Sequence, residues 1–175
     1  MAREDELFKR IEKGDKNAIE ELVALYYPEI LRYCIWNAPN RSLAEDAAQE
    51  TFLKAVRYFD RYVHQGKFKS FLYQIAANTC IDMKRRKWVT EVGYEQVAGE
   101  VEYQDGGFEE VDDNLQIRQL ISALPDDLQE IVILRYAQEL TMREIAGIVN
   151  LPLRTVQSKL RSALKRLRKE REGWQ

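Results

Sequence analysis

The sequence predicts an all-α protein made of two small helical domains joined by an acidic, flexible linker. Apolar residues recur at three- and four-residue spacing through most of the chain, and sustained period-two alternation is absent outside residues 89–113. Proline and glycine are sparse within these periodic segments. Residues 89–113 hold four glycines and nine acidic residues with no basic one, a composition that cannot bury much apolar surface. The chain is therefore expected to divide there.

Two helices are expected at the start of the chain. Gly14 closes a short first helix, and Asp15 can cap a second one that runs to about Asn37. Pro28 lies inside this second helix and should kink or split it, because proline lacks an N–H and its ring clashes with the preceding turn.

Two further helices are expected before the linker. Residues 42–45 (SLAE) fit the capping-box pattern, so a helix should run from there to about Tyr62. The next helix should run from about Phe68 to Trp88. Its apolar face is expected to consist of Phe71, Leu72, Ile75, Ala76 and Thr79.

The second half is expected to begin near Asp113, which is a suitable N-cap. A short amphipathic helix follows, with its apolar residues at Ile117, Leu120, Ile121 and Leu124. Pro125 suits the first position of another helix, which should run to about Tyr136.

The segment "TMREIAGIVNLPLRTVQSKLRSALKRL" predicts a helix-turn-helix. Residues 141–144 form a second capping box, Asn150 tolerates the left-handed conformation that ends a helix, and Pro152 starts the next one. Two helices joined by so short a turn must cross steeply. The second helix should bury Leu153, Val156, Leu160, Ala163, Leu164 and Leu167.

The opposite side of that second helix is basic, amidic and hydroxylic. It carries Arg154, Thr155, Gln157, Ser158, Lys159, Arg161, Ser162 and Lys165. A helix fits the major groove of B-form DNA, and arginine, lysine and glutamine suit base edges and phosphates. A solvated basic face is the alternative interpretation. The capping box and the short turn favour DNA binding.

The helix expected at 68–88 has a polar stripe of its own. Its members are Ser70, Gln74, Asn78, Asp82 and Arg85 or Arg86. Aromatic residues precede it, namely Tyr58, Phe59, Tyr62 and Phe68, together with His64. Amides, cations and aromatic rings are what unpaired bases bind. The alternative is that most of these aromatic residues belong to the core, and Phe71 with Tyr58 or Phe59 is expected there.

Charge is distributed unevenly along the chain. The formal net charge is −2, but residues 151–175 carry eight basic and two acidic residues, and residues 67–87 carry six basic and one acidic. Two basic segments separated by an acidic one indicate two contact surfaces.

Composition excludes several classes of protein. No apolar run is long enough to span a bilayer, and the charged N-terminus does not fit a signal peptide, so a cytoplasmic protein without stable membrane insertion is expected. Cys34 and Cys80 are expected to be buried free thiols. With His64 as the single histidine, a zinc site is disfavoured, and neither a metal nor another cofactor is expected.

Three motifs in order resemble those of bacterial sigma factors: "DAAQETFLKAVRYF" (46–59), "FKSFLYQIAANTCIDMKRRK" (68–87) and "LPDDLQEIVILRYAQELTMREIAGIVNLPLRTVQSKLRSALKRL" (124–167). The chain resembles the extracytoplasmic-function (ECF) group of the sigma-70 family, which keeps only regions 2 and 4. The resemblance implies region 2 at 1–88, a linker at 89–113 and region 4, with its helix-turn-helix, at 114–175.

The resemblance also implies partners. The first is core RNA polymerase, bound through its β′ clamp helices and its β flap region. The second is promoter DNA, both as duplex and as the unpaired non-template strand. The third is an anti-sigma factor. The residues implied in core polymerase binding are Asp46, Gln49, Glu50 and Leu53, which share one helical face. Those implied at the −10 element are Lys67, Phe68, Asn78, Asp82, Arg85 and Arg86. Those implied at the −35 element are Arg154, Thr155, Gln157, Ser158, Lys159, Arg161 and Lys165.

Several residues depart from the usual family pattern. Phe71 stands in place of tryptophan, a change expected to be tolerated in a core. Arg154 stands where the family usually has glycine, and Gln157 stands where it usually has a basic residue. Lys159 and Ser162 each stand where the family usually has arginine. The resemblance therefore implies the role of the recognition helix without implying which promoter sequence it prefers.

Two functions from different classes fit these residues. One is a sigma factor that directs promoter-specific initiation and is not an enzyme. The other is a dimeric helix-turn-helix repressor or activator that acts without core polymerase. A third interpretation, an enzyme, has little support, since the sequence offers no glycine-rich phosphate loop, metal-ligand cluster or nucleophile beside a histidine.

Overall fold

The computed structural model describes residues 2–59, 61, 66–90 and 111–173. These residues form helices and no strand, which confirms the predicted all-α class. The chain separates into two compact units, residues 1–103 and 104–175, which are described here one at a time. The expected linker lies almost wholly outside the described residues, as do Tyr62 and His64.

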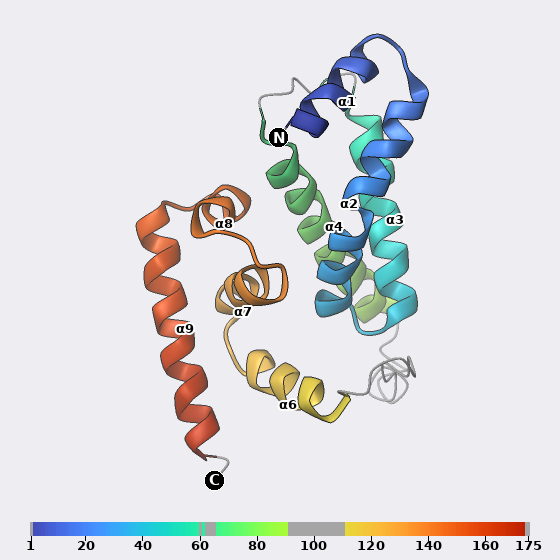
Figure 1. Cartoon of the computed structure of the whole chain (residues 1–175). Coiled ribbons are helices and arrows are strands. Elements are labelled where there is room, and N and C mark those ends of the chain that lie inside the picture. The colour runs from blue at the N-terminus through green and yellow to red at the C-terminus, as the bar shows by residue number, and fades with distance from the viewer. Residues whose placement is uncertain (1, 60, 62–65, 91–110, 174–175) are drawn as a thin grey trace. The chain divides into compact units, whose positions relative to one another are not determined.

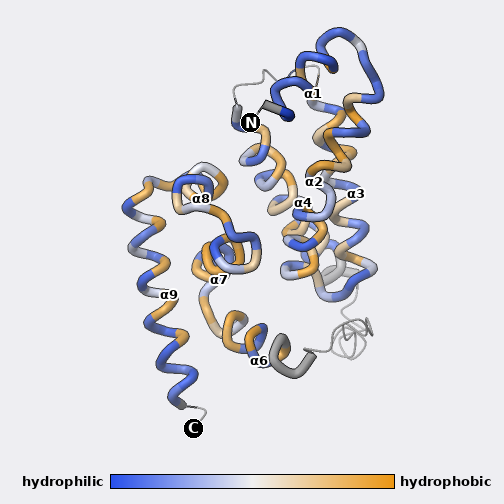
Figure 2. Tube along the Cα trace, in the orientation of Figure 1, coloured by the Kyte–Doolittle hydropathy of each residue, from blue (hydrophilic) through white to orange (hydrophobic). Residues whose placement is uncertain are grey.

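The first unit is a bundle of three long helices with a short helix packed at one end (Figure 1). The short helix is α1 (Ala2–Glu12), and the bundle comprises α2 (Lys16–Asn37), α3 (Arg41–Arg57) and α4 (Phe68–Thr90). α3 packs against both α2 and α4, while α1 packs on α2. The apolar sides of these helices face inward, and the outer sides are hydrophilic (Figure 2).

An aromatic cluster joins α1 to the start of α4. The Phe68 ring lies 5.1 Å from that of Phe8 and 5.5 Å from that of Tyr26, measured between centroids, and Phe59 and Phe71 also pack against it. The Tyr26 hydroxyl donates a 2.7 Å hydrogen bond to the buried Glu4 carboxylate. α1 is thus fixed by contacts with residues far away in sequence.

α2 agrees with the sequence at both ends but not at its proline. Asp15 caps it by accepting a hydrogen bond from the Asn17 N–H, and the helix ends at Asn37 as predicted. Of the kink or split predicted at Pro28, the split is wrong, because α2 continues through this exposed residue, and the kink stays a prediction. Buried residues on both sides of Pro28, including Tyr26 and Ile30, keep the two halves packed on the same core.

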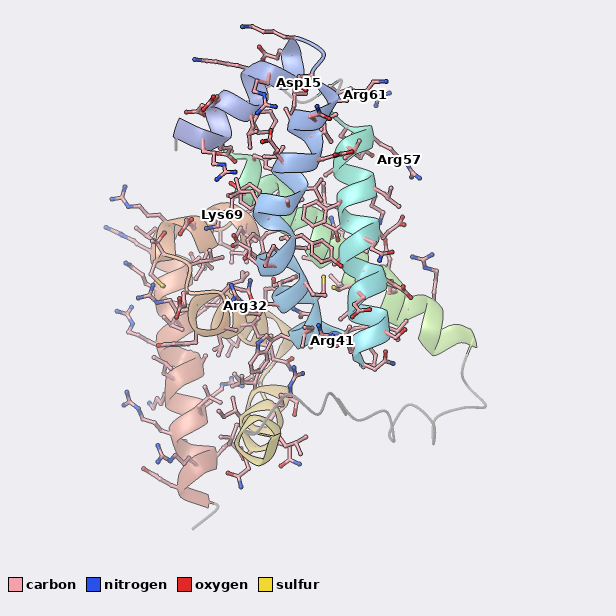
Figure 3. The ribbon with its side chains drawn as sticks, turned by 45° about the vertical axis from the view of Figure 1, so that its right-hand side comes forward. Asp15, Arg32, Arg41, Arg57, Arg61 and Lys69 are labelled. Atoms are coloured by element: carbon pink, nitrogen blue, oxygen red, sulfur yellow. The ribbon has the colours of Figure 1, made fainter. Side chains whose placement is uncertain are left out.

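α3 differs from the prediction at both ends. Its N-cap is Asn40, whose side chain accepts a 2.8 Å hydrogen bond from the Leu43 N–H, so the capping box predicted at Ser42 is wrong. The helix ends at Arg57 and not near Tyr62. The chain tightens there, with the Phe59 N–H bonded to the Val56 carbonyl, and Phe59 turns toward the aromatic cluster. Figure 3 shows Arg41 and Arg57 at the two ends of α3.

α4 begins at Phe68 as predicted and runs to Thr90. Of its expected apolar face, Leu72, Ala76 and Thr79 are buried, while Phe71 and Ile75 are half-buried. Tyr73 is also fully buried although it lies outside that predicted stripe, because it packs against Tyr33 of α2 and donates a 2.6 Å hydrogen bond to Glu29.

The second unit is built from short helices around the long α9. It comprises α6 (Val111–Ser122), α7 (Asp126–Val132), the π-helical turn η1 (Ile133–Ala137), α8 (Met142–Val149) and α9 (Leu153–Gly173). α9 packs against α6, α7 and α8. One core cluster comprises Leu124, Leu128, Val132 and Ala163, flanked by Ile121, Leu160 and Leu167.

Two helix starts in this unit differ from the prediction. α6 begins at Val111, so Asp113 lies inside it and is not its N-cap. Pro125 occupies the N-cap position of α7 and not the first helical position. The predicted helix to Tyr136 is also interrupted, because α7 ends at Val132 and continues as the π-helical turn η1.

The predicted helix-turn-helix is present. Thr141 and Glu144 form the capping box, with bonds of 3.1 Å and 2.9 Å, and Asn150 ends α8 with φ of 57°. Ile145 and Ile148 of α8 are buried, and of the stripe predicted for α9, Val156 and Ala163 are buried while Leu153, Leu160, Leu164 and Leu167 are half-buried. Pro152 lies immediately before α9, which starts one residue later than predicted. No helix among the described residues has the length and apolar character needed to cross a membrane.

Candidate functional site

An acidic face with one large apolar residue lies on α3, and we call it the α3 face: Asp46, Gln49, Glu50 and Leu53. It lies opposite the buried residues of the same helix, which include Ala47, Ala48, Thr51 and Phe52. Leu53 is 54 % exposed, and Val56, one turn further on, is 37 % exposed. Such apolar exposure beside carboxylates suits a protein partner better than solvent.

The carboxylates of the α3 face have no neutralising partner among the described residues. Arg41 pairs with Glu45, one residue before Asp46, at 3.1 Å. Lys54, four residues after Glu50, donates instead to the Thr79 hydroxyl of α4 at 3.1 Å. Asp46 is exposed and Glu50 is half-buried, so neither negative charge is neutralised by a described side chain.

A mixed polar face lies on α4 and just before it. Lys67, Asn78, Asp82, Arg85 and Arg86 are all exposed. Lys67 follows Gly66, whose φ of 76° is a left-handed conformation that favours glycine. These side chains are accessible to a nucleic acid strand, and we call them the α4 face.

Phe68 does not belong to this face. It is 1 % exposed, at the centre of the aromatic cluster, so the sequence-based expectation of a base contact is not supported by its position. Phe59 and Phe71 are half-buried in the same cluster, in line with the alternative interpretation that these rings are core. Among the described residues just before α4, Tyr58 is an exposed aromatic side chain, at 49 % exposure.

The outer side of α9 carries a third face, the α9 face. Arg154, Gln157, Ser158, Arg161 and Lys165 are exposed, and Thr155 and Lys159 are half-buried. Arg154 and Gln157 lie in its first two turns, the part of a recognition helix that approaches base edges. Arg154, Arg161 and Lys165 have no ion-pair partner among the described residues, so their charges are available to phosphates.

Lys159 differs from the other cations of the α9 face. Its ammonium lies 2.5 Å from a carboxylate oxygen of Asp127, in the first turn of α7. The hydrogen bond from Lys159 holds the pKa of Asp127 below its usual value. Asp126 and Asp127 both lie in the first turn of α7, where negative charge complements the helix dipole.

An open groove of about 370 Å³ adjoins the α9 face. Its lining residues are Arg135, Tyr136, Met142, Gln157, Leu160 and Arg161. Tyr136 is 55 % exposed, and Arg135 donates a 2.9 Å hydrogen bond to the Leu140 carbonyl, which orders the segment leading into α8. Sequence reasoning missed Arg135 and Tyr136, because a regular α-helix was expected where the π-helical turn lies.

The two cysteines are buried free thiols, as predicted. A hydrogen bond to Cys80 and burial together raise the pKa of Cys34, so Cys34 is not placed as a reactive thiolate. Among the described residues, no group of three or more histidine, cysteine and acidic side chains could hold a metal ion.

Known protein families match both units. The model of Sigma-70 region 2 matches residues 22–90, and that of Sigma-70, region 4 matches residues 114–167. The ECF RNA polymerase sigma factor SigW of Bacillus subtilis (strain 168) is 31 % identical over 174 residues, which cover 93 % of each chain. The ECF RNA polymerase sigma-E factor of Escherichia coli (strain K12) is 30 % identical, over 88 % of this chain and 86 % of that one.

Solved structures share the fold. CnrH in complex with the cytosolic domain of CnrY has a TM-score of 0.74 at 17 % identity, covering 95 % of this chain and 96 % of CnrH. The sigma factor RpoE in complex with the anti-sigma factor NepR from Bartonella quintana has a TM-score of 0.64 at 23 % identity, covering 86 % and 94 %. With both regions matched in order over nearly the whole chain, the protein belongs to the ECF group of the sigma-70 family, alternative sigma factors that direct transcription with core RNA polymerase.

Proposed function

We propose that the three faces divide the work of a sigma factor between the two units. The observation that carries the proposal is that each matched region exposes a polar face opposite its buried core: α3 and α4 in region 2, and α9 in region 4. Each face also coincides with residues to which the family resemblance assigns a contact.

The α3 face binds the clamp helices of the β′ subunit of core polymerase. Its two unpaired carboxylates suit a basic helix, and Leu53 offers an apolar centre that a partner can bury. Charge steers the encounter, while burial of Leu53 opposes dissociation.

The α4 face captures the unpaired non-template strand of the −10 element. Lys67, Arg85 and Arg86 supply positive charge for phosphates, and Asn78 can donate to and accept from an exposed base edge. Because Phe68 is buried, base stacking falls to Tyr58, which among the described residues is the exposed ring nearest to Phe68 in sequence.

The α9 face binds the −35 element as duplex. Arg154 and Gln157 read base edges in the major groove, while Arg161 and Lys165 contact phosphates. The adjoining groove places Tyr136 and Arg135 beside Gln157 and Arg161, where they can contact the flanking sugar-phosphate backbone.

We also propose that the protein acts in the cytoplasm, without catalytic activity of its own, under the control of an anti-sigma factor. The Bartonella quintana RpoE structure, which shares the fold, contains the anti-sigma factor NepR. That partnership motivates a search for a comparable regulator here.

Binding to core polymerase tests the proposal. The double variant Gln49→Ala, Glu50→Lys should lose retention on immobilised core polymerase while keeping wild-type helicity. Glu20→Lys is the matched control, since Glu20 is an exposed glutamate on α2, outside the α3 face. Retention of the double variant at the wild-type level would contradict the role of the α3 face.

The competing function, a dimeric repressor or activator, makes the opposite prediction about core polymerase. A repressor of this kind would bind its promoter specifically and alone, whereas a sigma factor protects promoter DNA from nuclease only when core polymerase is added. Specific footprints by the free chain, unchanged on addition of core polymerase, would favour the repressor.

A further inference from the structure

The Asp127–Lys159 ion pair joins two helices that are fixed relative to each other. Asp127 precedes Leu128, which is buried in the core cluster that also contains Ala163 of α9. The carboxylate is thereby held beside the second turn of α9, at 2.5 Å from the Lys159 ammonium. The Lys159 and Asp127 side chains are 32 % and 52 % exposed, so the pair is open to solvent and to a competing anion.

The position of Lys159 gives this pair a consequence for DNA. Lys159 lies on α9 between Gln157 and Arg161, both of which are exposed on the α9 face. A carboxylate bound to its ammonium occupies the place that a phosphate oxygen would take. Asp127 is therefore an internal competitor for this one cation, while Arg154, Arg161 and Lys165 have no such competitor among the described residues.

We propose that Asp127 limits the binding of duplex DNA by holding Lys159 away from phosphates. This inference rests on the proposed binding of duplex DNA by the α9 face. The effect is to lower affinity for DNA of any sequence, because phosphates are the same everywhere, while Arg154 and Gln157 remain free to read bases. Asp127 thus lowers affinity for promoter and bulk DNA alike, and discrimination between them is left to Arg154 and Gln157. The lowered pKa of Asp127 agrees with a carboxylate that keeps its charge and its partner at neutral pH.

The test measures binding of the full chain to a random-sequence duplex by fluorescence anisotropy, across a series of salt concentrations. Asp127→Asn should tighten binding roughly three- to tenfold at low salt, and its plot of log affinity against log salt should steepen by about 0.9, the value for one added phosphate contact. Asp126→Asn is the matched control. It removes the same charge from the same helical turn, but Asp126 pairs with no lysine among the described residues, so its slope should not change.

The Lys159→Gln variant shows whether the gain in DNA affinity caused by Asp127→Asn depends on Lys159. In the Lys159→Gln background, Asp127→Asn should give no increase in affinity beyond that of Asp126→Asn. Equal affinities and slopes for Asp127→Asn and Asp126→Asn would overturn the inference, as would a gain that persists without Lys159. An absence of duplex binding in every variant would overturn the inference too, because Lys159 is inferred to contact a DNA phosphate once Asp127→Asn releases it.

Two further variants separate this inference from the proposed function. Arg161→Ala and Lys165→Ala should each weaken duplex binding, since both side chains are exposed on the α9 face and far along the helix from its first turn. If they weaken binding and Asp127→Asn behaves like its control, only the role of Asp127 is wrong. If they leave binding unchanged, the α9 face itself is wrongly assigned.

Discussion

The two units reach their folds by different means. In the second unit, the signals that set the helix ends lie within a few residues of those ends: the Thr141–Glu144 capping box and the left-handed Asn150 are examples. In the first unit, positions are set by contacts across the sequence, such as Phe8 with Phe68 and Glu4 with Tyr26. The difference teaches that local signals fix the ends of α8, whereas contacts between distant residues fix the start of α4.

The largest expected effect comes from the centre of the aromatic cluster. Phe68→Ala should destabilise the first unit by about 3–5 kcal/mol, because it removes a buried ring that four other rings contact. Hydrogen exchange should show lost protection in α1, α2 and α4, with α8 and α9 unchanged. Phe68→Leu is the control and should cost less, since it keeps much of the apolar volume. A loss below about 1 kcal/mol for the alanine variant would mean that Phe68 is not core.

The next effect concerns the attachment of α1. Tyr26→Phe should destabilise the first unit by about 1–3 kcal/mol, because it leaves the buried Glu4 carboxylate without its hydrogen bond. Urea denaturation measures the change. Replacing both residues, as Tyr26→Phe with Glu4→Leu, should recover part of the loss, since no polar group is then left unpaired. No recovery in the double variant would show that α1 is held by packing alone.

Helix caps test the comparison directly, since one was predicted correctly and one was not. Thr141→Ala and Asn40→Ala should each cost about 1 kcal/mol, because each removes a side chain that accepts a hydrogen bond from a free backbone N–H. Ser42→Ala should change stability by less than about 0.5 kcal/mol, since Ser42 is an exposed first-turn residue and not the cap. Thermal unfolding of the three variants ranks them. A larger loss of stability for Ser42→Ala than for Asn40→Ala would show that Ser42 is the cap, as the sequence predicts.

The smallest expected effect is a gain. Glu139 adopts φ of 55°, a left-handed conformation that costs a residue with a Cβ about 1 kcal/mol. Glu139→Gly relieves this strain, but glycine also raises the conformational entropy of the unfolded chain, which offsets part of the gain. The second unit should therefore become more stable by about 0.5 kcal/mol. Glu139→Ala keeps the Cβ and should give no comparable gain in the same thermal unfolding measurement.

Much of the functional surface could be predicted from sequence because it follows helical periodicity. A helix that buries Ala47, Thr51 and Phe52 must expose Gln49 and Leu53, so the α3 face required no knowledge of its neighbours. The same holds for the α9 face opposite Val156 and Ala163. Cap sequences then located the helix-turn-helix to within one residue.

The remainder depends on which distant segments meet. The resemblance implies a −10 contact for Phe68, and nothing near Phe68 in the sequence reveals that Phe8 and Tyr26 cover it. Lys159 was placed among free cations because its partner, Asp127, lies 32 residues away. Periodicity gives the direction of a side chain relative to its own helix, but the partner depends on tertiary packing.

The assignment of strand capture to α4 and duplex reading to α9 is tested most directly by one comparison of two variants. Wild-type, Asn78→Ala and Gln157→Ala holoenzymes are assembled on a promoter identified by sequencing transcripts after overexpression, as duplex and with a pre-melted −10 bubble. Permanganate reactivity of −10 thymines reports melting, and a −35 footprint reports duplex binding. Asn78→Ala should keep the −35 footprint and lose permanganate reactivity on duplex, whereas Gln157→Ala should weaken the footprint on both templates. Normal melting by Asn78→Ala, together with a melting defect and an intact footprint in Gln157→Ala, would show that the two faces have been assigned the wrong way round.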